Sequence, residues 1–263
     1  MRRKVVACFA LAGILSGAGR CGAQIAQNSP LKSDPDRTKA AKEKNDKAIA
    51  SNALLEQVNI ATQSKQWQQA ADLLKQLITM NPDTWIYRQS LGGAQLNLGQ
   101  FDEAAKSYDS GIKLAQTELS SRAPDSDSVN IKAGIAAMLT SEGNAYLKLW
   151  KNDLAVAAYW KAAELTPNPA VAYFNICAVQ YNTGNTNAAM QACDRAIAAD
   201  PNKADAYFIK GSLLIADSKV DGQGKMTAPP GAVEALKKYL ELSPAGPHAA
   251  DVKAMLDFVG AKQ

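Results

Sequence analysis

Apolar residues recur with a helical period of three to four residues through most of the chain, from about residue 49 onward. Consecutive periodic stretches are joined by short polar turns, as in "NLGQFDEA", "KLWKNDLA" and "NTGNTNAA". Aromatic residues make up only 6 % of the chain and alanine is abundant, which favours close-packed helices over a β-sandwich. The pattern therefore predicts an all-α fold of antiparallel helix pairs.

The predicted helix pairs repeat along the chain. Pro167 and Pro201 are 34 residues apart and end the similar phrases "YWKAAELTP" and "CDRAIAADP", and related phrases end at Pro82 and Pro244. Small residues let antiparallel helices approach closely, and a proline ends the second helix of a pair. Small residues recur at fixed distances before the unit ends, namely Ala70, Ala104, Ala155, Ala189 and Ala232, and Gly92, Gly143, Cys177 and Gly211.

The period, the Gly and Ala positions, Tyr108, Tyr159 and the closing prolines together resemble the tetratricopeptide repeat family over about residues 51–244. The resemblance implies an α-solenoid of about five antiparallel helix pairs. The amphipathic segment "HAADVKAMLDFVG" after Pro247 is predicted to be a C-terminal capping helix. We assign residues 49–246 to the repeat array and residues 247–263 to the capping helix and tail.

Two insertions interrupt the period. An excess of 17 residues after Gln116 predicts a lengthened helix, a loop at "RAPDSDS" (residues 122–128) and a lengthened following helix. An excess of nine residues falls in "SKVDGQGKMTAPPG" and predicts a long loop inside the last hairpin.

The N-terminus has the layout of a secretory signal peptide. A basic start is followed by a run of 15 mostly apolar residues from Val5 to Gly19, and Cys21-Gly22-Ala23 offers a cleavage site after Ala23. The alternative is a membrane anchor, although a span needs about 20 apolar residues. Residues 1–23 are thus predicted to be the signal peptide and residues 24–48 a flexible, charged linker. We expect a periplasmic or secreted protein with no membrane span in the mature chain.

Charge and chemistry-bearing residues give little support to catalysis or nucleic-acid binding. The net charge of +4 comes entirely from residues 1–23, which leaves 25 basic and 25 acidic residues after cleavage. The basicity is therefore no argument for a nucleic-acid partner. His248, the sole histidine, is expected at the surface, so the sequence predicts no catalytic triad, metal site or cofactor.

The resemblance implies that the first helix of each unit lines a concave groove. Only Glu56 and Lys148 bring charge to the predicted face. An asparagine offers both a donor and an acceptor and so matches a peptide backbone, although these asparagines could equally just solvate a helix face. The groove residues singled out are Asn59, Asn97, Asn144, Asn175 and Asn182, with Phe174 and Tyr181.

The function predicted from these features is that of an exported, non-catalytic scaffold that binds a protein or an extended peptide in its groove. Two alternatives stay open: a membrane-tethered envelope assembly factor, and an enzyme with its active site in the groove. The enzyme would need a buried carboxylate pair with perturbed pKa values, because the sequence offers no convergent nucleophile and base.

Cys177 and Cys193 each lie eight residues from Asn185, which sits in a turn. Residues equally far from the turn of an antiparallel helix pair meet at the same height, because both helices rise equally per residue. By the same register, Gly92 faces Tyr108, Gly143 faces Tyr159 and Gly211 faces Leu236. In an oxidising compartment we expect a disulfide between the two cysteines, and the alternative is a pair of buried thiols.

Overall fold

The computed structural model describes residues 35–222, 224 and 226–261, and the chain divides into two units, Met1–Lys44 and Asn45–Gln263. The predicted signal peptide and the first part of the predicted linker lie outside the described residues. The remainder of the linker is helical, because α1 (Pro35–Gln63) runs through it, and its residues from Lys39 to Ala50 are exposed.

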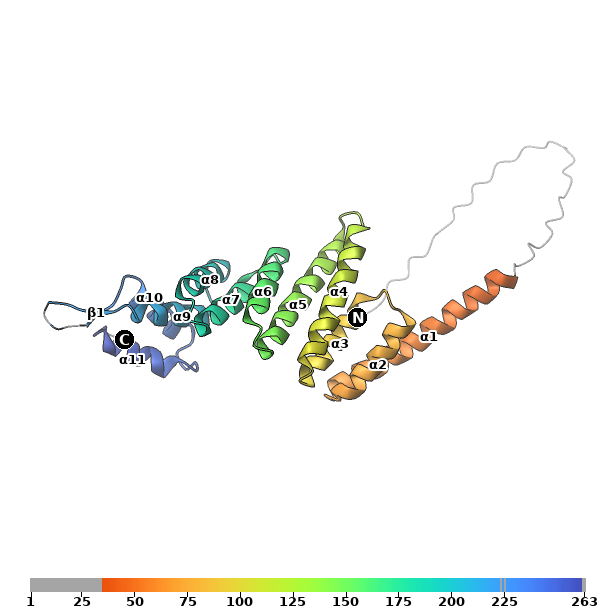
Figure 1. The fold of residues 1–263 in the computed structure, drawn as a ribbon, viewed down its shortest axis with the longest axis horizontal. Coiled ribbons are helices and arrows are strands. Elements are labelled where there is room, and N and C mark those ends of the chain that lie inside the picture. The colour runs from red at the N-terminus through yellow and green to blue at the C-terminus, as the bar shows by residue number, and fades with distance from the viewer. Residues whose placement is uncertain (1–34, 223, 225, 262–263) are drawn as a thin grey trace, which may run out of the picture. The chain divides into compact units, whose positions relative to one another are not determined.

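Ten of the described helices form five pairs within this fold, and the last helix follows the fifth pair (Figure 1). In the second unit each helix from α2 onward packs against the next one in sequence, and α11 packs on α10 and α9. The all-α prediction of about five helix pairs with a C-terminal capping helix is confirmed. The elements after α1 are α2 (Trp67–Met80), α3 (Trp85–Asn97), α4 (Phe101–Ser120), α5 (Ser126–Lys148), α6 (Asn152–Leu165), α7 (Ala170–Asn182), α8 (Thr186–Ala199), α9 (Ala204–Ile215), β1 (Lys219–Val220), β2 (Met226–Thr227), α10 (Ala232–Leu242) and α11 (Ala249–Phe258).

A small residue on the first helix of a pair meets a large ring or side chain on the second. A Cβ atom added to Gly92 would lie 2.8 Å from the Tyr108 ring, and one added to Gly143 would lie 2.6 Å from the Tyr159 ring. Both tyrosines are buried, so the rings have little room to move. The predicted pairing is confirmed, and the contact fixes how closely the two helices of a hairpin can approach.

The alanines of the period lie at the centre of the packed interfaces. All five are fully buried, with no exposed surface in the folded chain. An alanine there fills the space between helix backbones without holding them apart, and it favours the helix itself. These residues are Ala70, Ala104, Ala155, Ala189 and Ala232.

The first insertion lengthens two neighbouring helices, as predicted. Helix α4 has 20 residues and α5 has 23, against 11 to 14 in the other paired helices after α1. The Trp85 indole donates a hydrogen bond to Glu118 of α4 at 3.0 Å, and a Cβ added to Gly134 of α5 would lie 2.4 Å from its ring. Trp85 at the start of α3 thus packs against both lengthened helices.

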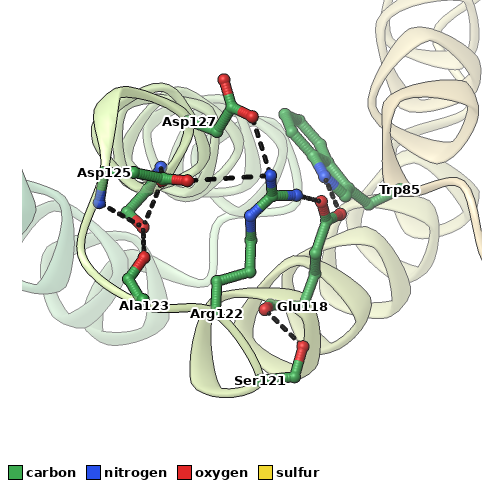
Figure 2. A network of polar contacts seen from close by, with 8 residues as sticks. Trp85, Glu118, Ser121, Arg122, Ala123, Asp125 and Asp127 are labelled. Atoms are coloured by element: carbon green, nitrogen blue, oxygen red, sulfur yellow. Dashed lines mark hydrogen bonds and ion pairs between the residues drawn. The ribbon is translucent and has the colours of Figure 1, made fainter. Parts of the chain in front are cut away.

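The loop between α4 and α5 is held by a polar network (Figure 2). The Arg122 guanidinium reaches Glu118 at 2.9 Å and Asp127 at 2.7 Å. Asp125 caps α5, because its side chain accepts the Ser128 N–H at 2.8 Å while the Asp125 N–H donates to the Ser128 hydroxyl. The helix therefore begins at Ser126, and the prediction that the loop extends to residue 128 is wrong.

The C-terminal part departs from the prediction in two details. The second insertion contains a short antiparallel strand pair, β1 with β2, where only a long loop was expected. His248 is half-buried, and its ring stacks on Phe208 with a centroid distance of 3.9 Å, while its backbone N–H donates a hydrogen bond to the Tyr239 hydroxyl at 3.0 Å. Val252 and Leu256 bury the inner face of α11 against α10.

Among the described residues, no helix has both the length and the apolarity that crossing a bilayer requires.

Adjacent glycines of α3 give a matched test of the hairpin contact. We expect Gly92→Ala to lower the free energy of unfolding by about 1–3 kcal/mol, because the new methyl group collides with a buried ring. Gly93→Ala should be neutral or stabilise by about 0.5–1 kcal/mol, since its Cβ would meet only the Tyr108 hydroxyl at 3.8 Å and alanine favours helix. Chemical denaturation measures both, and equal effects would contradict the contact.

The Asp125 cap predicts a pH-dependent contribution to stability. The hydrogen bond from the Ser128 backbone lowers the pKa of Asp125 below that of an ordinary aspartate. The stabilisation by the ionised cap is therefore fully present at pH values above the ordinary aspartate pKa, and it is lost as the pH falls through the lowered pKa of the folded protein. We expect Asp125→Ala to lower the melting temperature by a few degrees at pH 7, with a gap to wild type that narrows below about pH 4.

Asp125→Asn is the control for this cap, because asparagine also caps a helix but does not titrate in this range. Its melting temperature at pH 7 should stay close to that of the wild type. A constant gap between wild type and Asp125→Ala from pH 7 to pH 2 would show that the charged cap is not what stabilises this helix end.

Candidate functional site

Three of the predicted groove asparagines meet in one pocket. Asn144 comes from α5, and Asn175 and Asn182 come from α7. The pocket has a volume of about 300 Å³. We call it the carboxamide pocket; its lining residues are Asn144, Leu147, Trp150, Asn152, Tyr159, Asn175, Ala178, Val179, Asn182 and Thr183.

Tyr159 sets the orientation of Asn144. Its hydroxyl donates a hydrogen bond of 2.7 Å to the Asn144 Oδ1 atom. Burial raises the pKa of Tyr159 to about 12, so the phenol keeps its proton and remains a donor at neutral pH. With Oδ1 engaged, the Nδ2 group of the exposed Asn144 is the part of the side chain left to donate to a ligand.

The carboxamide pocket is uncharged. All ten lining side chains are neutral, and Leu147, Ala178 and Val179 give it apolar walls beside the carboxamides. A charged group entering such a pocket would lose hydration without gaining an opposite charge, which is unfavourable. The arrangement therefore suits a neutral ligand that carries hydrogen-bonding groups and some apolar surface.

The other predicted groove residues lie outside this pocket. Asn59 is exposed on α1, and the exposed Asn97 donates its Nδ2 to the Gly93 carbonyl one turn earlier in α3. Phe174 and Tyr181 of α7 are half-buried against the core around the two cysteines, and the Lys203 ammonium lies 4.8 Å from the Phe174 ring centroid. A role for these four residues in binding stays a prediction.

A second hollow adjoins the carboxamide pocket. Its volume is about 430 Å³, and it is lined by the turn after α5, the start of α6 and the end of α7. Trp150, Asn152, Val179 and Thr183 line both. The Trp150 side chain is largely exposed, with an exposed fraction of 87 %. We call this second cavity the turn hollow.

The roles of Trp150 and Tyr159 in this region could not be predicted from helical periodicity. Tyr159 was assigned only to the hairpin contact, yet the same ring that packs on Gly143 brings its hydroxyl to Asn144. Trp150 lies in a turn and so falls outside any helical face. Its place in the repeat does carry a signal, because glycine stands at the corresponding turn positions Gly99 and Gly184.

Among the described residues, a partly buried ionisable pair lies elsewhere, in a different hollow lined by α4, α5 and α6. The Tyr146 hydroxyl donates to the Glu142 carboxyl at 3.1 Å, and burial raises the pKa of Glu142. Burial, with the neighbouring Glu142 charge, also raises the pKa of Tyr146 to about 12. This is a single buried carboxyl paired with a phenol, and it is separate from the carboxamide pocket.

The cysteine pair is brought together across its hairpin. Cys177 of α7 and Cys193 of α8 are fully buried, their Cα atoms are 5.1 Å apart, and their sulfur atoms are at disulfide distance, 1.93 Å. The small cysteine side chains occupy the place that glycine and tyrosine fill in the neighbouring hairpin. The oxidation state in the native protein stays a prediction.

The array of paired helices, with small residues at each crossing, defines an α-solenoid of helical hairpins. The tetratricopeptide repeat family model matches residues 55–118 and 140–204. These two segments, which contain Asn144, Asn175 and Asn182, are therefore similar to tetratricopeptide repeats. Repeats of this kind are generally protein-binding scaffolds without catalytic activity.

Solved structures support the same fold. A crystal structure of MamA protein is 18 % identical, has a TM-score of 0.57, and covers 76 % of this chain and 94 % of its own. YrrB, described as a TPR protein with an unusual peptide-binding site, is 18 % identical with a TM-score of 0.54, covering 82 % and 97 %. MamA from Desulfovibrio magneticus RS-1 is 17 % identical with a TM-score of 0.56, covering 75 % and 97 %. A search of curated protein sequences found no match.

The cysteine pair can be tested on mature protein isolated without reductant. We expect no reactive thiols from Cys177 and Cys193 after denaturation, and two after reduction. Reduction should also lower the free energy of unfolding by about 3 kcal/mol, because the bond closes a loop of 16 residues. The double variant Cys177→Ala/Cys193→Ala is the control, since its stability should not respond to reductant. Two reactive thiols before reduction would show that the pair is a pair of buried thiols.

Proposed function

We propose that this protein is an exported, non-catalytic scaffold that binds a neutral, extended segment of a protein partner in the carboxamide pocket. The observation that carries the proposal is the convergence of Asn144, Asn175 and Asn182 in one uncharged pocket with Asn144 oriented by Tyr159. Each of these side chains presents hydrogen-bonding groups that a peptide backbone can satisfy.

An extended peptide suits this geometry. Its backbone offers a carbonyl and an N–H at every residue, spaced by about 3.3 Å along the chain. The free Nδ2 of Asn144 would donate to a peptide carbonyl, while Asn175 and Asn182 of α7 each offer both a donor and an acceptor, about two helical turns apart. Main-chain hydrogen bonds would give affinity without strong dependence on the partner's sequence.

Known proteins with the same fold give limited support. The description of YrrB names a peptide-binding site, and that protein shares the solenoid architecture with this chain. At 18 % identity the likeness extends to the fold. The proposal for this chain therefore rests on its own side chains in the carboxamide pocket.

Export belongs to the proposal as well. Its support is the signal-like sequence of residues 1–23 and the cysteine pair at disulfide distance, which suits an oxidising compartment. N-terminal sequencing of the native protein tests it, and a start at Gln24 is the expected result. A chain that retains residues 1–23 would favour the membrane-tethered assembly factor instead.

Peptides selected from a phage-displayed library of random dodecapeptides provide a probe for binding. We expect Asn144→Ala/Asn175→Ala to weaken the selected peptides by about tenfold or more, because two hydrogen bonds to the ligand are lost. Tyr159→Phe should also weaken binding, since it releases Asn144 while keeping the ring against Gly143. Titration calorimetry gives the affinities, and thermal melting shows that each variant is folded.

Two control variants separate the pocket from general effects. Asn130→Ala removes an exposed asparagine of α5 outside the carboxamide pocket, and Tyr108→Phe makes the same change as Tyr159→Phe in the preceding hairpin. Both should leave the affinities unchanged. Selection of no peptide, or peptides that bind the double asparagine variant as tightly as the wild type, would overturn the proposed function.

A further inference from the structure

Four helix pairs are closed by the same turn. One residue in each turn has a positive φ, its N–H bonds to the carbonyl three residues earlier, and the next N–H bonds to the carbonyl five residues before itself. The four residues are Lys65 (φ 56°), Gly99 (φ 75°), Trp150 (φ 59°) and Gly184 (φ 77°).

Trp150 is an unfavourable choice for this turn. The left-handed region suits glycine, because a Cβ atom crowds the following carbonyl, and a bulky residue there is a clear outlier. The turn itself is formed equally well by Gly99 and Gly184, so its geometry does not require a tryptophan. Local folding therefore gives no reason for the indole.

Packing does not explain Trp150 either. With 87 % of its surface exposed, it has the largest exposed fraction among the exposed large apolar residues of the described chain. Because the exposed indole removes little apolar surface from water, it adds little to the stability of the fold. Trp150 is also not a single exposed apolar residue, because the exposed Leu154 lines the same hollow. A strained tryptophan within an exposed apolar group points to a contact with something outside the chain.

The position of Trp150 indicates where that contact lies. The indole contributes to the carboxamide pocket and to the turn hollow, so it stands where the two cavities adjoin. The turn hollow adds the apolar side chains of Leu154 and Val156 and shares Val179 with the carboxamide pocket. A segment bound in the carboxamide pocket and continuing past this turn would cross the indole.

We infer that Trp150 is an apolar anchor of this site, and that the bound segment is uncharged and places a bulky apolar side chain in the turn hollow. This rests on the proposed function and names the class of sequence that the site selects. The charge of the site fits such an occupant: the carboxamide pocket is neutral, and Lys151 and Asp153 give the turn hollow charges of opposite sign. Lys151 is moreover paired with Asp102 at 3.0 Å.

Tryptophan is among the residues that contribute most to binding when a partner covers them, because its large ring buries much area with few rotatable bonds. The fully extended backbone alternates its side chains. A peptide with its main chain on the asparagines can therefore direct one side chain into the turn hollow while its neighbours face solvent.

The experiment uses phage-displayed random dodecapeptides selected on the full mature chain, followed by affinity measurements on Trp150→Gly. We expect the selected sequences to share an uncharged core with at least one Leu, Ile, Phe, Tyr or Trp. Trp150→Gly should weaken these peptides by about tenfold or more, and should raise the melting temperature by about 2–4 °C because glycine relieves the left-handed strain.

Lys65→Gly is the matched control. It makes the same backbone change in the equivalent turn between α1 and α2, so it should raise the melting temperature in the same way and leave the affinities unchanged. A second readout follows the indole directly: a saturating peptide should protect wild-type fluorescence from acrylamide quenching and have much less effect in Trp150→Gly.

The outcomes separate this inference from the proposed function. Peptides that lose affinity in Asn144→Ala/Asn175→Ala but bind Trp150→Gly within threefold of wild type would overturn the role of Trp150 and leave the carboxamide pocket standing. Selected peptides with a charged core would overturn the neutral, apolar specificity. If the peptides bind both Asn144→Ala/Asn175→Ala and Trp150→Gly as tightly as the wild type, the inference and the proposed function are overturned together.

Discussion

The close approach of the two helices within each hairpin is the constraint on which the rest of the structure depends. Where glycine meets a tyrosine ring, at Gly92 and Gly143, even one added methyl group would collide with a buried aromatic. A single hairpin cannot bury its apolar surface alone, so each pair needs its neighbours, and the stack needs α11 at its C-terminal end. Alanines without exposed surface keep the helix backbones close throughout.

The same contact also prepares the candidate site. Tyr159 packs its ring on Gly143 and presents its hydroxyl to Asn144, so a residue that holds the hairpin together also orients a polar group in the carboxamide pocket. Because the ring is fixed by packing, the carboxamide is oriented before any ligand arrives. Preorganisation of this kind lowers the entropy lost on binding, which matters for a site that relies on a few hydrogen bonds.

The sequence predicts the architecture well because the same spacing and the same residue types recur in each repeat. The 34-residue spacing, the small residue facing Tyr108 or Tyr159, and the lengthened helices around the first insertion could all be derived before the structure. What could not be derived depends on local or side-chain geometry. Helix α5 begins early because Asp125 and Ser128 cap each other, and Asn97 turns back to its own helix. Trp150 belongs to a turn, so no helical periodicity points to it.

Side-chain amide NMR of the mature, ¹⁵N-labelled protein shows whether a peptide binds to the asparagines of the carboxamide pocket. On addition of a selected peptide, we expect the Nδ2 resonances of Asn144 and Asn175 to shift strongly and their protons to exchange more slowly with solvent, because the groups become hydrogen-bonded and covered. The resonance of Asn130, an exposed asparagine outside the pocket, should stay where it is. Perturbations confined to other surfaces, with the amides of Asn144 and Asn175 unchanged at saturation, would show that the peptide does not bind in the carboxamide pocket.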